Sequence, residues 1–192
     1  SNLLVDRFLR CEVEFGENIE LDERVVLEIG SGPIYGWGPL GTMLGTAKYY
    51  ALEPTHDSQV GELNPGYFEG FALEIKRNMI ERVKRNWNSI SETIDTELIV
   101  PVSVPVEKIH LPNSSVDTVI SNSVLEHIGS LVQAAKELAR VTKPGGFHYH
   151  IVDLKDHGSD IDPFKNIYPV NPERNHQLHA RRGMVINLDR VP

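Results

Sequence analysis

Five short, mostly apolar runs divide the chain and have the length of buried strands. They lie at residues 25–29, 48–52, 97–106, 116–121 and 147–152. Pro101 and Pro105 interrupt the third run, and they suit the ends of a strand better than its middle because proline has no amide hydrogen to donate. A Lys-Pro-Gly-Gly turn at residues 143–146 precedes the fifth run. The pattern therefore predicts five strands.

Amphipathic stretches lie between these runs and predict helices. The helices are expected at residues 3–10 and 131–141, with one or two more at residues 67–90. The long connection at residues 67–90 fits a crossover helix that packs on the sheet, while residues 64–71 could instead form a lid over a substrate. Alternating strands and helices predict an α/β fold with a Rossmann-like, mostly parallel, doubly wound sheet.

Length and composition limit the classes of function. A chain of 192 residues fits a single domain, with its core at residues 24–157 and an irregular segment at residues 158–192. A formal net charge of −8 makes nucleic acid an unlikely partner, because phosphate recognition needs a basic surface. The single cysteine, Cys11, excludes an internal disulfide. No apolar run is long enough to span a bilayer, so we expect a cytoplasmic protein without membrane contact.

Two glycines follow the first predicted strand and carry the first chemical signal. Gly30 and Gly32 let the backbone approach a ligand closely, and open parallel sheets bind ligands beyond the carboxyl ends of their strands. Glu53 ends the second strand, where an acidic side chain accepts hydrogen bonds from ribose hydroxyls. A third glycine of the dinucleotide fingerprint would fall at Tyr35, which weakens the alternative of a nicotinamide-dependent oxidoreductase.

Four segments in this order resemble the class I S-adenosylmethionine-dependent methyltransferases, in particular those that act on small molecules and saccharides. The segments are Glu28 with Gly30 and Gly32, Glu53, residues 106–128 and residues 137–146. The resemblance implies S-adenosylmethionine as the cofactor, with S-adenosylhomocysteine as the product. It also implies that the cofactor is held by residues Glu28, Gly30, Ser31, Gly32, Glu53, Pro54, Val106, Glu107, Asn122 and Ser123.

The chain departs from the family pattern at three places. Pro105 stands where the family usually has an aspartate for the adenine amino group, and Ile34 stands where a further glycine is common. Complete family members add two strands after the fifth, whereas this chain offers one candidate, at residues 185–188. An exposed sheet edge invites pairing, so a homodimer is a further expectation.

Candidate catalytic residues follow the fourth and fifth strands. If the acceptor is a hydroxyl, a general base helps, and His127 follows the fourth strand near the expected position of the acceptor; the alternative is that His127 caps or packs the loop. Asp153 and His157 follow the fifth strand and are expected to line the acceptor pocket. His148 and His150 alternate along that strand and share one face, with Asp153 on the other, so no metal site is expected.

The sequence therefore predicts a methyltransferase that modifies an oxygen or nitrogen of a small molecule such as a sugar or secondary metabolite. The alternative is a catalytically degenerate domain that keeps the fold as an interaction module. Pro105 and the missing terminal strands favour that alternative.

Overall fold

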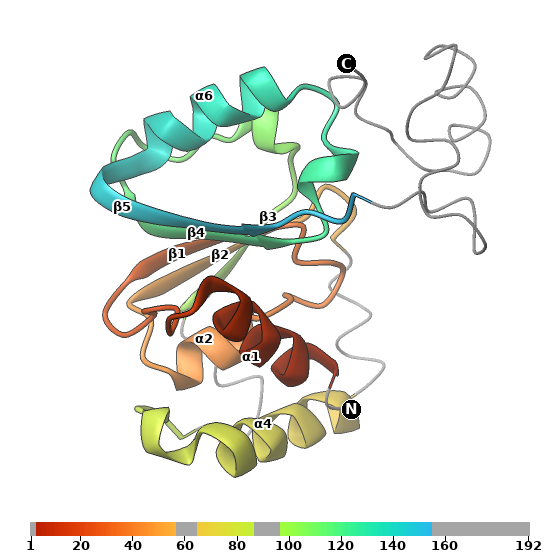
Figure 1. Ribbon diagram of the computed structural model, residues 1–192, viewed down its shortest axis with the longest axis vertical. Coiled ribbons are helices and arrows are strands. Elements are labelled where there is room, and N and C mark those ends of the chain that lie inside the picture. Colours follow the sequence, from red (N-terminus) through yellow and green to blue (C-terminus); the bar gives the residue numbers. More distant parts are fainter. Residues whose placement is uncertain (1–2, 57–64, 87–96, 155–192) are drawn as a thin grey trace, which may run out of the picture.

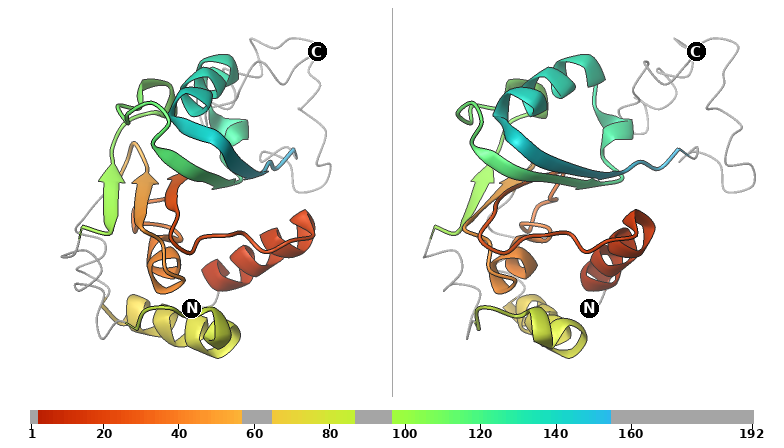
Figure 2. Two further views of the ribbon diagram at one scale, coloured as in Figure 1. Left: turned by 90° about the vertical axis from the view of Figure 1, so that its left-hand side faces the viewer. Right: turned by 60° about the vertical axis from the view of Figure 1, so that its left-hand side comes forward.

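The computed structural model describes residues 3–56, 65–86 and 97–154, which form one five-stranded parallel sheet in the order β3-β2-β1-β4-β5. The strands are β1 (Val25–Ile29), β2 (Lys48–Leu52), β3 (Ile99–Val102), β4 (Val116–Asn122) and β5 (Thr142–Ile151). Figure 2 shows β1, β2 and β3 side by side and pointing the same way. The predicted Rossmann-like sheet is confirmed.

Helices cover both faces of this sheet (Figure 1). On one face lie α1 (Leu3–Phe15), α2 (Gly38–Met43) and α4 (Pro65–Met79), and on the other lies α6 (Leu131–Val141). Three short 3-10 helices, η1 (Ile80–Arg82), η2 (Val106–Lys108) and η3 (Leu125–His127), complete the described elements. None of the helices in the described ranges has the length and apolar character needed to cross a membrane.

The residues of β1 alternate between two hydrophobic clusters, one on each face. Val26 packs in the cluster beneath α1, α2 and α4, whereas Leu27 and Ile29 pack in the cluster beneath α6. All three side chains are buried. Burial on both faces explains why the strand reads as a continuous apolar run.

The third strand is shorter than predicted, and one proline lies inside it. β3 begins at Ile99 and ends at Val102, and Pro101 is paired in register with Ala51. This position is tolerated because β3 lies at the edge of the sheet formed by the described strands and pairs there with β2. The expectation that both prolines lie at strand ends is therefore wrong for Pro101, while Pro105 lies beyond the strand.

The turn predicted before the fifth strand is a bulge within β5. Val116 pairs with Thr142 and Thr118 pairs with Phe147, so residues 143–146 bulge out opposite Asp117. Lys143 Nζ lies 2.8 Å from both carboxylate oxygens of Asp117. This ion pair ties the bulge to β4.

Helices α1 and α2 depart from the prediction for identifiable reasons. α1 extends to Phe15 because Cys11 and Glu12 on its last turns are buried, and Glu12 accepts hydrogen bonds from the Arg82 guanidinium at 2.8 Å. α2 was not predicted, because all of its residues are buried and the segment has no amphipathic pattern. The predicted strand at residues 185–188 and the segment at residues 158–192 lie outside the described residues.

One buried carboxyl group holds the loop between β1 and α2. Glu28 is 6% exposed, and its Oε2 accepts hydrogen bonds from the Trp37 amide and the Tyr49 hydroxyl, each at 2.9 Å. The Trp37 indole in turn donates to the Leu4 carbonyl at 2.8 Å, which links the loop to α1. Burial raises the pKa of Glu28 to about 8, although the hydrogen bonds from Trp37 and Tyr49 act to lower it.

Protonation of Glu28 makes a testable contribution to stability. Its folded-state pKa lies above its unfolded value, so the folded chain holds a proton that the unfolded chain has lost between about pH 4.5 and pH 8. Across this range we expect wild-type stability to fall, relative to the Glu28→Gln variant, by about 1.4 kcal/mol per pH unit. Urea unfolding of both proteins at several pH values measures this difference, and the histidine contributions common to both cancel. A difference that is independent of pH would contradict the buried, protonated carboxyl group.

Candidate functional site

A cavity of about 560 Å³ opens at the carboxyl ends of β1 and β2. Its wall includes six of the residues predicted from the sequence, namely Gly30, Glu53, Pro54, Val106, Glu107 and His127. Apolar side chains form most of the remaining wall, among them Ile29, Leu52, Val124 and Ile128. A mostly apolar pocket with a few polar groups is the usual form of a site for a small organic ligand.

The two glycines of the loop after β1 play different parts. Gly30 has a φ of +70°, and a Cβ atom there would lie 2.3 Å from Cγ2 of Val124. Its amide donates to the Leu52 carbonyl at 2.8 Å, which binds the loop to the end of β2. Gly32 has a φ of +67°, and a Cβ atom there would meet nothing within 4 Å. Space for a ligand therefore lies beside the Gly32 backbone.

The Glu53 carboxylate is fixed at the end of β2 by its own turn. Its Oε1 accepts hydrogen bonds from the Thr55 amide at 3.0 Å and from the Thr55 hydroxyl at 2.6 Å. The Glu53 amide donates to the Val102 carbonyl at 3.1 Å, which places the residue against β3. Among the described residues Oε2 takes part in no hydrogen bond, so it is available to accept from a ligand hydroxyl.

η2 forms the opposite wall of the cavity. Val106 is buried, and Oε1 of Glu107 accepts a hydrogen bond from the Ser130 amide at 3.3 Å. Pro105 precedes η2 and also lines the cavity. An aspartate at the position of Pro105 could accept from an adenine amino group, whereas proline offers only its carbonyl.

Five predicted cofactor residues are absent from the wall of the cavity, namely Glu28, Ser31, Gly32, Asn122 and Ser123. Glu28 lies beneath the loop, as described above, and positions its backbone. Ser31 is buried, and its amide donates to the Leu52 carbonyl at 3.2 Å. Asn122 ends β4, and the Ser123 hydroxyl donates to its Oδ1 at 3.3 Å.

The candidate base His127 has a buried carboxylate beside it that the sequence did not single out. The Glu126 side chain is fully buried, and its Oε1 lies 4.0 Å from Nε2 of His127. The same oxygen accepts a hydrogen bond from the Asp153 amide at 3.3 Å, while Oε2 has no hydrogen-bond partner among the described residues. Glu126 thus lies between two predicted catalytic residues, His127 and Asp153. An acidic residue next to the candidate base was the available signal.

The structure does not bring every predicted catalytic residue into the cavity. Asp153 donates its amide hydrogen to Glu126 in η3, and it is not among the residues that line the cavity. His157 lies outside the described residues.

His148 and His150 face a separate groove beside α6. Burial lowers the pKa of both, and the nearby His148 helps to bring that of His150 to about 4. In the described part of the chain, no group of three or more His, Cys, Asp or Glu residues could hold a metal ion.

Comparisons with known proteins agree with this geometry. The family described as "Methyltransferase domain" matches residues 58–150, from before α4 into β5. No curated protein matches the sequence. A SAM-dependent methyltransferase from Aquifex aeolicus matches 95% of this chain and 82% of its own length, at 16% identity and a TM-score of 0.53.

Two other solved structures extend the comparison. One is a complex between the Haloferax volcanii Trm112 methyltransferase activator and a methyltransferase. The match covers 95% of this chain and 62% of the other chain, at 14% sequence identity and a TM-score of 0.53. The chain spans about half of the S-adenosylmethionine-dependent methyltransferase from Listeria monocytogenes, at 52% of that protein and 71% of this chain, with 18% identity and a TM-score of 0.44.

The family match begins at residue 58, so it does not include the glycine loop after β1 or Glu53. Both of these follow strands of the sheet described above, and they contribute Gly30 and Glu53 to the cavity. Residues 58–150 match the methyltransferase domain family, and the chain shares the fold of the SAM-dependent methyltransferase from Aquifex aeolicus.

Proposed function

We propose that this domain transfers the methyl group of S-adenosylmethionine to an oxygen or nitrogen of a small molecule, such as a sugar or secondary metabolite. The observation that carries the proposal is the cavity at the ends of β1 and β2, which combines the Gly30 backbone, the Glu53 carboxylate and the apolar Val106. These three features suit the backbone-contacting, ribose and adenine parts of the cofactor.

Each part of the cavity has a role in this proposal. Oε2 of Glu53 accepts hydrogen bonds from the ribose hydroxyls, because Thr55 already occupies Oε1. Val106 packs against the adenine ring, with Glu107 beside it in η2. The open space beside Gly32 admits the methionine part of the cofactor. Pro105 leaves the adenine amino group to backbone or solvent.

The reaction requires positioning more than a protein nucleophile. When bound, the cofactor supplies a methyl group on a positively charged sulfur. The chain holds the acceptor in line with that methyl group, and such orientation is worth roughly 7–11 kcal/mol of the barrier. We expect Asn122 and Ser123, at the end of β4, to contact the acceptor or the methionine part.

For a hydroxyl acceptor, His127 takes the proton and Glu126 positions the imidazole. His127 lines the cavity, and its Nε2 lies 4.0 Å from a carboxylate oxygen of Glu126. A buried negative charge at this distance stabilises the imidazolium that forms when the base accepts a proton. Asp153 holds Glu126 through its amide.

The first prediction concerns the ribose contact. Calorimetric titration with S-adenosylhomocysteine is expected to show binding that weakens about tenfold or more in Glu53→Ala, because a hydrogen bond to a charged group is worth about 1.5–3 kcal/mol. Glu14→Ala, on the exposed side of α1, is the matched control and should bind as the wild type does. NAD should not bind.

Absence of S-adenosylhomocysteine binding would contradict the proposal and favour the interaction-module alternative, for which Pro105 is the specific observation. Equal binding by Glu53→Ala and the wild type would exclude Glu53 as the ribose ligand while leaving the cofactor assignment intact.

A second prediction separates the two glycines. Gly30→Ala should destabilise the fold by more than about 2 kcal/mol, since the new methyl group meets Val124 in addition to the strain of a positive φ. Gly32→Ala should cost only about 1–2 kcal/mol from that strain, yet weaken S-adenosylhomocysteine binding. Urea unfolding and calorimetry measure the two effects. Wild-type affinity in a folded Gly32→Ala protein would show that the cofactor does not approach this backbone.

A third prediction tests the base. With a hydroxyl acceptor found by screening sugars and phenols for S-adenosylhomocysteine release, His127→Ala should lower turnover about 100-fold. Glu126→Gln should lower it less, because the neutral amide still packs but no longer stabilises the imidazolium. The exposed His110→Ala is the control. Turnover within threefold of the wild type in His127→Ala would remove this residue from the mechanism.

A further inference from the structure

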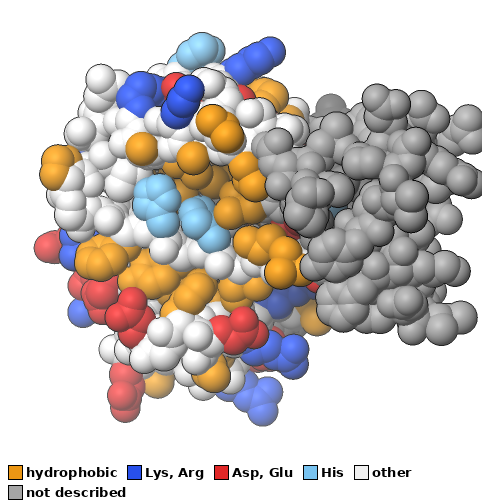
Figure 3. Space-filling view, turned by 45° about the horizontal axis from the view of Figure 1, so that its top comes forward, with side chains coloured by type: hydrophobic (Ala, Val, Ile, Leu, Met, Phe, Trp, Pro, Cys, Tyr) orange, Lys and Arg blue, Asp and Glu red, His pale blue; other side chains and the backbone are white. Residues whose placement is uncertain are grey.

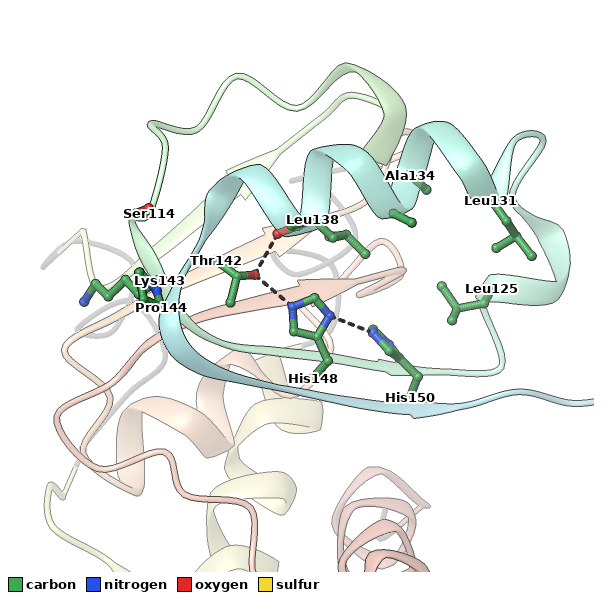
Figure 4. A pocket seen from close by; sticks show the side chains of 12 residues that line it. Ser114, Leu125, Leu131, Ala134, Leu138, Thr142, Lys143, Pro144, His148 and His150 are labelled. Carbon is green, nitrogen blue, oxygen red and sulfur yellow. Dashed lines mark hydrogen bonds between the residues drawn. The ribbon is translucent and has the colours of Figure 1, made fainter.

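A groove of about 620 Å³ runs between α6 and β5, apart from the cofactor cavity. Its wall on the helix side is apolar and includes Leu131, Ala134 and Leu138, while His148 and His150 project into it from β5 (Figure 4). Figure 3 shows histidine side chains bordered by hydrophobic ones on this face. The groove is open to solvent, and His148 is exposed.

A chain of hydrogen bonds fixes both imidazole rings. The Thr142 hydroxyl donates its single hydrogen to the Leu138 carbonyl at 2.7 Å, so it must accept from Nε2 of His148, which lies 2.8 Å away. Nδ1 of the neutral His148 ring therefore carries a lone pair. This nitrogen faces Nε2 of His150 at 3.4 Å, and Nδ1 of His150 lies 2.7 Å from the Ser121 hydroxyl.

The separation of the two facing nitrogens is long for a hydrogen bond and matches a pair of metal ligands. Zinc–imidazole bonds of about 2.0–2.1 Å, joined across 3.4 Å, give an angle of about 110° at the ion, close to the tetrahedral value. The other nitrogen of each ring is bonded to a hydroxyl oxygen, as the outer nitrogens of metal-binding histidines almost always are.

We propose that His148 and His150 form a binding site for a divalent transition-metal ion of the zinc, cobalt, nickel and copper group. Imidazole suits these ions, and the described residues that line the groove include no carboxylate that would favour magnesium or calcium. Nδ1 of His148 and Nε2 of His150 are the ligands. Water or a small ligand in the groove completes the coordination.

Binding at this site is balanced in protons. When the metal binds, His150 changes tautomer, so that its ring proton lies on Nδ1 instead of Nε2. The Nδ1–H group then donates a hydrogen bond to the Ser121 hydroxyl oxygen, whose own hydrogen turns away, and no proton leaves the protein. Lys143 also lines the groove, and its positive charge is paired with both carboxylate oxygens of Asp117 at 2.8 Å. The site therefore carries little electrostatic penalty against a cation.

The test uses Co²⁺ with the full chain, free of any polyhistidine tag. We expect a visible absorption band of tetrahedral or five-coordinate cobalt and about one ion per chain by calorimetry. His148→Ala and His150→Ala should each weaken binding about tenfold or more, because each removes one of the two protein ligands. The exposed His110→Ala is the matched control and should bind as the wild type does.

Cobalt binding that survives the double substitution His148→Ala/His150→Ala would overturn the proposal, as would the lack of any saturable binding by the wild type. The double variant should retain affinity for S-adenosylhomocysteine, because neither histidine lines the cofactor cavity. The metal site therefore stands or falls independently of the methyltransferase function.

Discussion

The buried Glu28 carboxyl group is the contact on which the proposed cofactor site depends. One of its oxygens accepts hydrogen bonds from the Trp37 amide and from the Tyr49 hydroxyl. These bonds join the loop after β1 to the neighbouring strand β2. A Cβ atom at Gly36 would lie within 2.3 Å of this carboxylate, which shows how closely the loop folds over it. Contacts inside the protein therefore fix the shape of this loop.

The sheet places two different sites on the same molecule. Loops at the carboxyl ends of β1 and β2 form the cavity with polar groups at its rim, which suits a nucleoside. β5 has no strand on its outer side among the described residues, and its histidines face the groove under α6. The first site follows from the parallel topology, whereas the second depends on the particular residues of β5.

The sequence predicted the parts of the structure that depend on local pattern. β1 and β2 begin and end at the predicted residues, because a short apolar run followed by glycine or proline marks where a buried strand ends. Gly30, Glu53 and His127 come together as expected, since the ends of parallel strands meet at one edge. α2 could not be predicted, because a helix buried on every side lacks an amphipathic pattern.

Side-chain contacts between distant segments were also beyond the sequence. The role of Glu126 depends on a hydrogen bond from the Asp153 amide, 27 positions away in the sequence. The tautomer of His148 depends on which acceptor the Thr142 hydroxyl donates its hydrogen to. Strand alternation did place His148 and His150 on one face, but it could not give the 3.4 Å between their nitrogens.

Mapping of backbone amide shifts by NMR upon addition of S-adenosylhomocysteine tests the central claim most directly, because it locates the ligand without requiring an acceptor. The account predicts that the amides of Gly30, Gly32, Glu53 and Glu107 shift, while those of α1 and of the groove under α6 do not. Shifts confined to that groove, or the absence of any shift, would contradict the assignment of the cavity as the cofactor site.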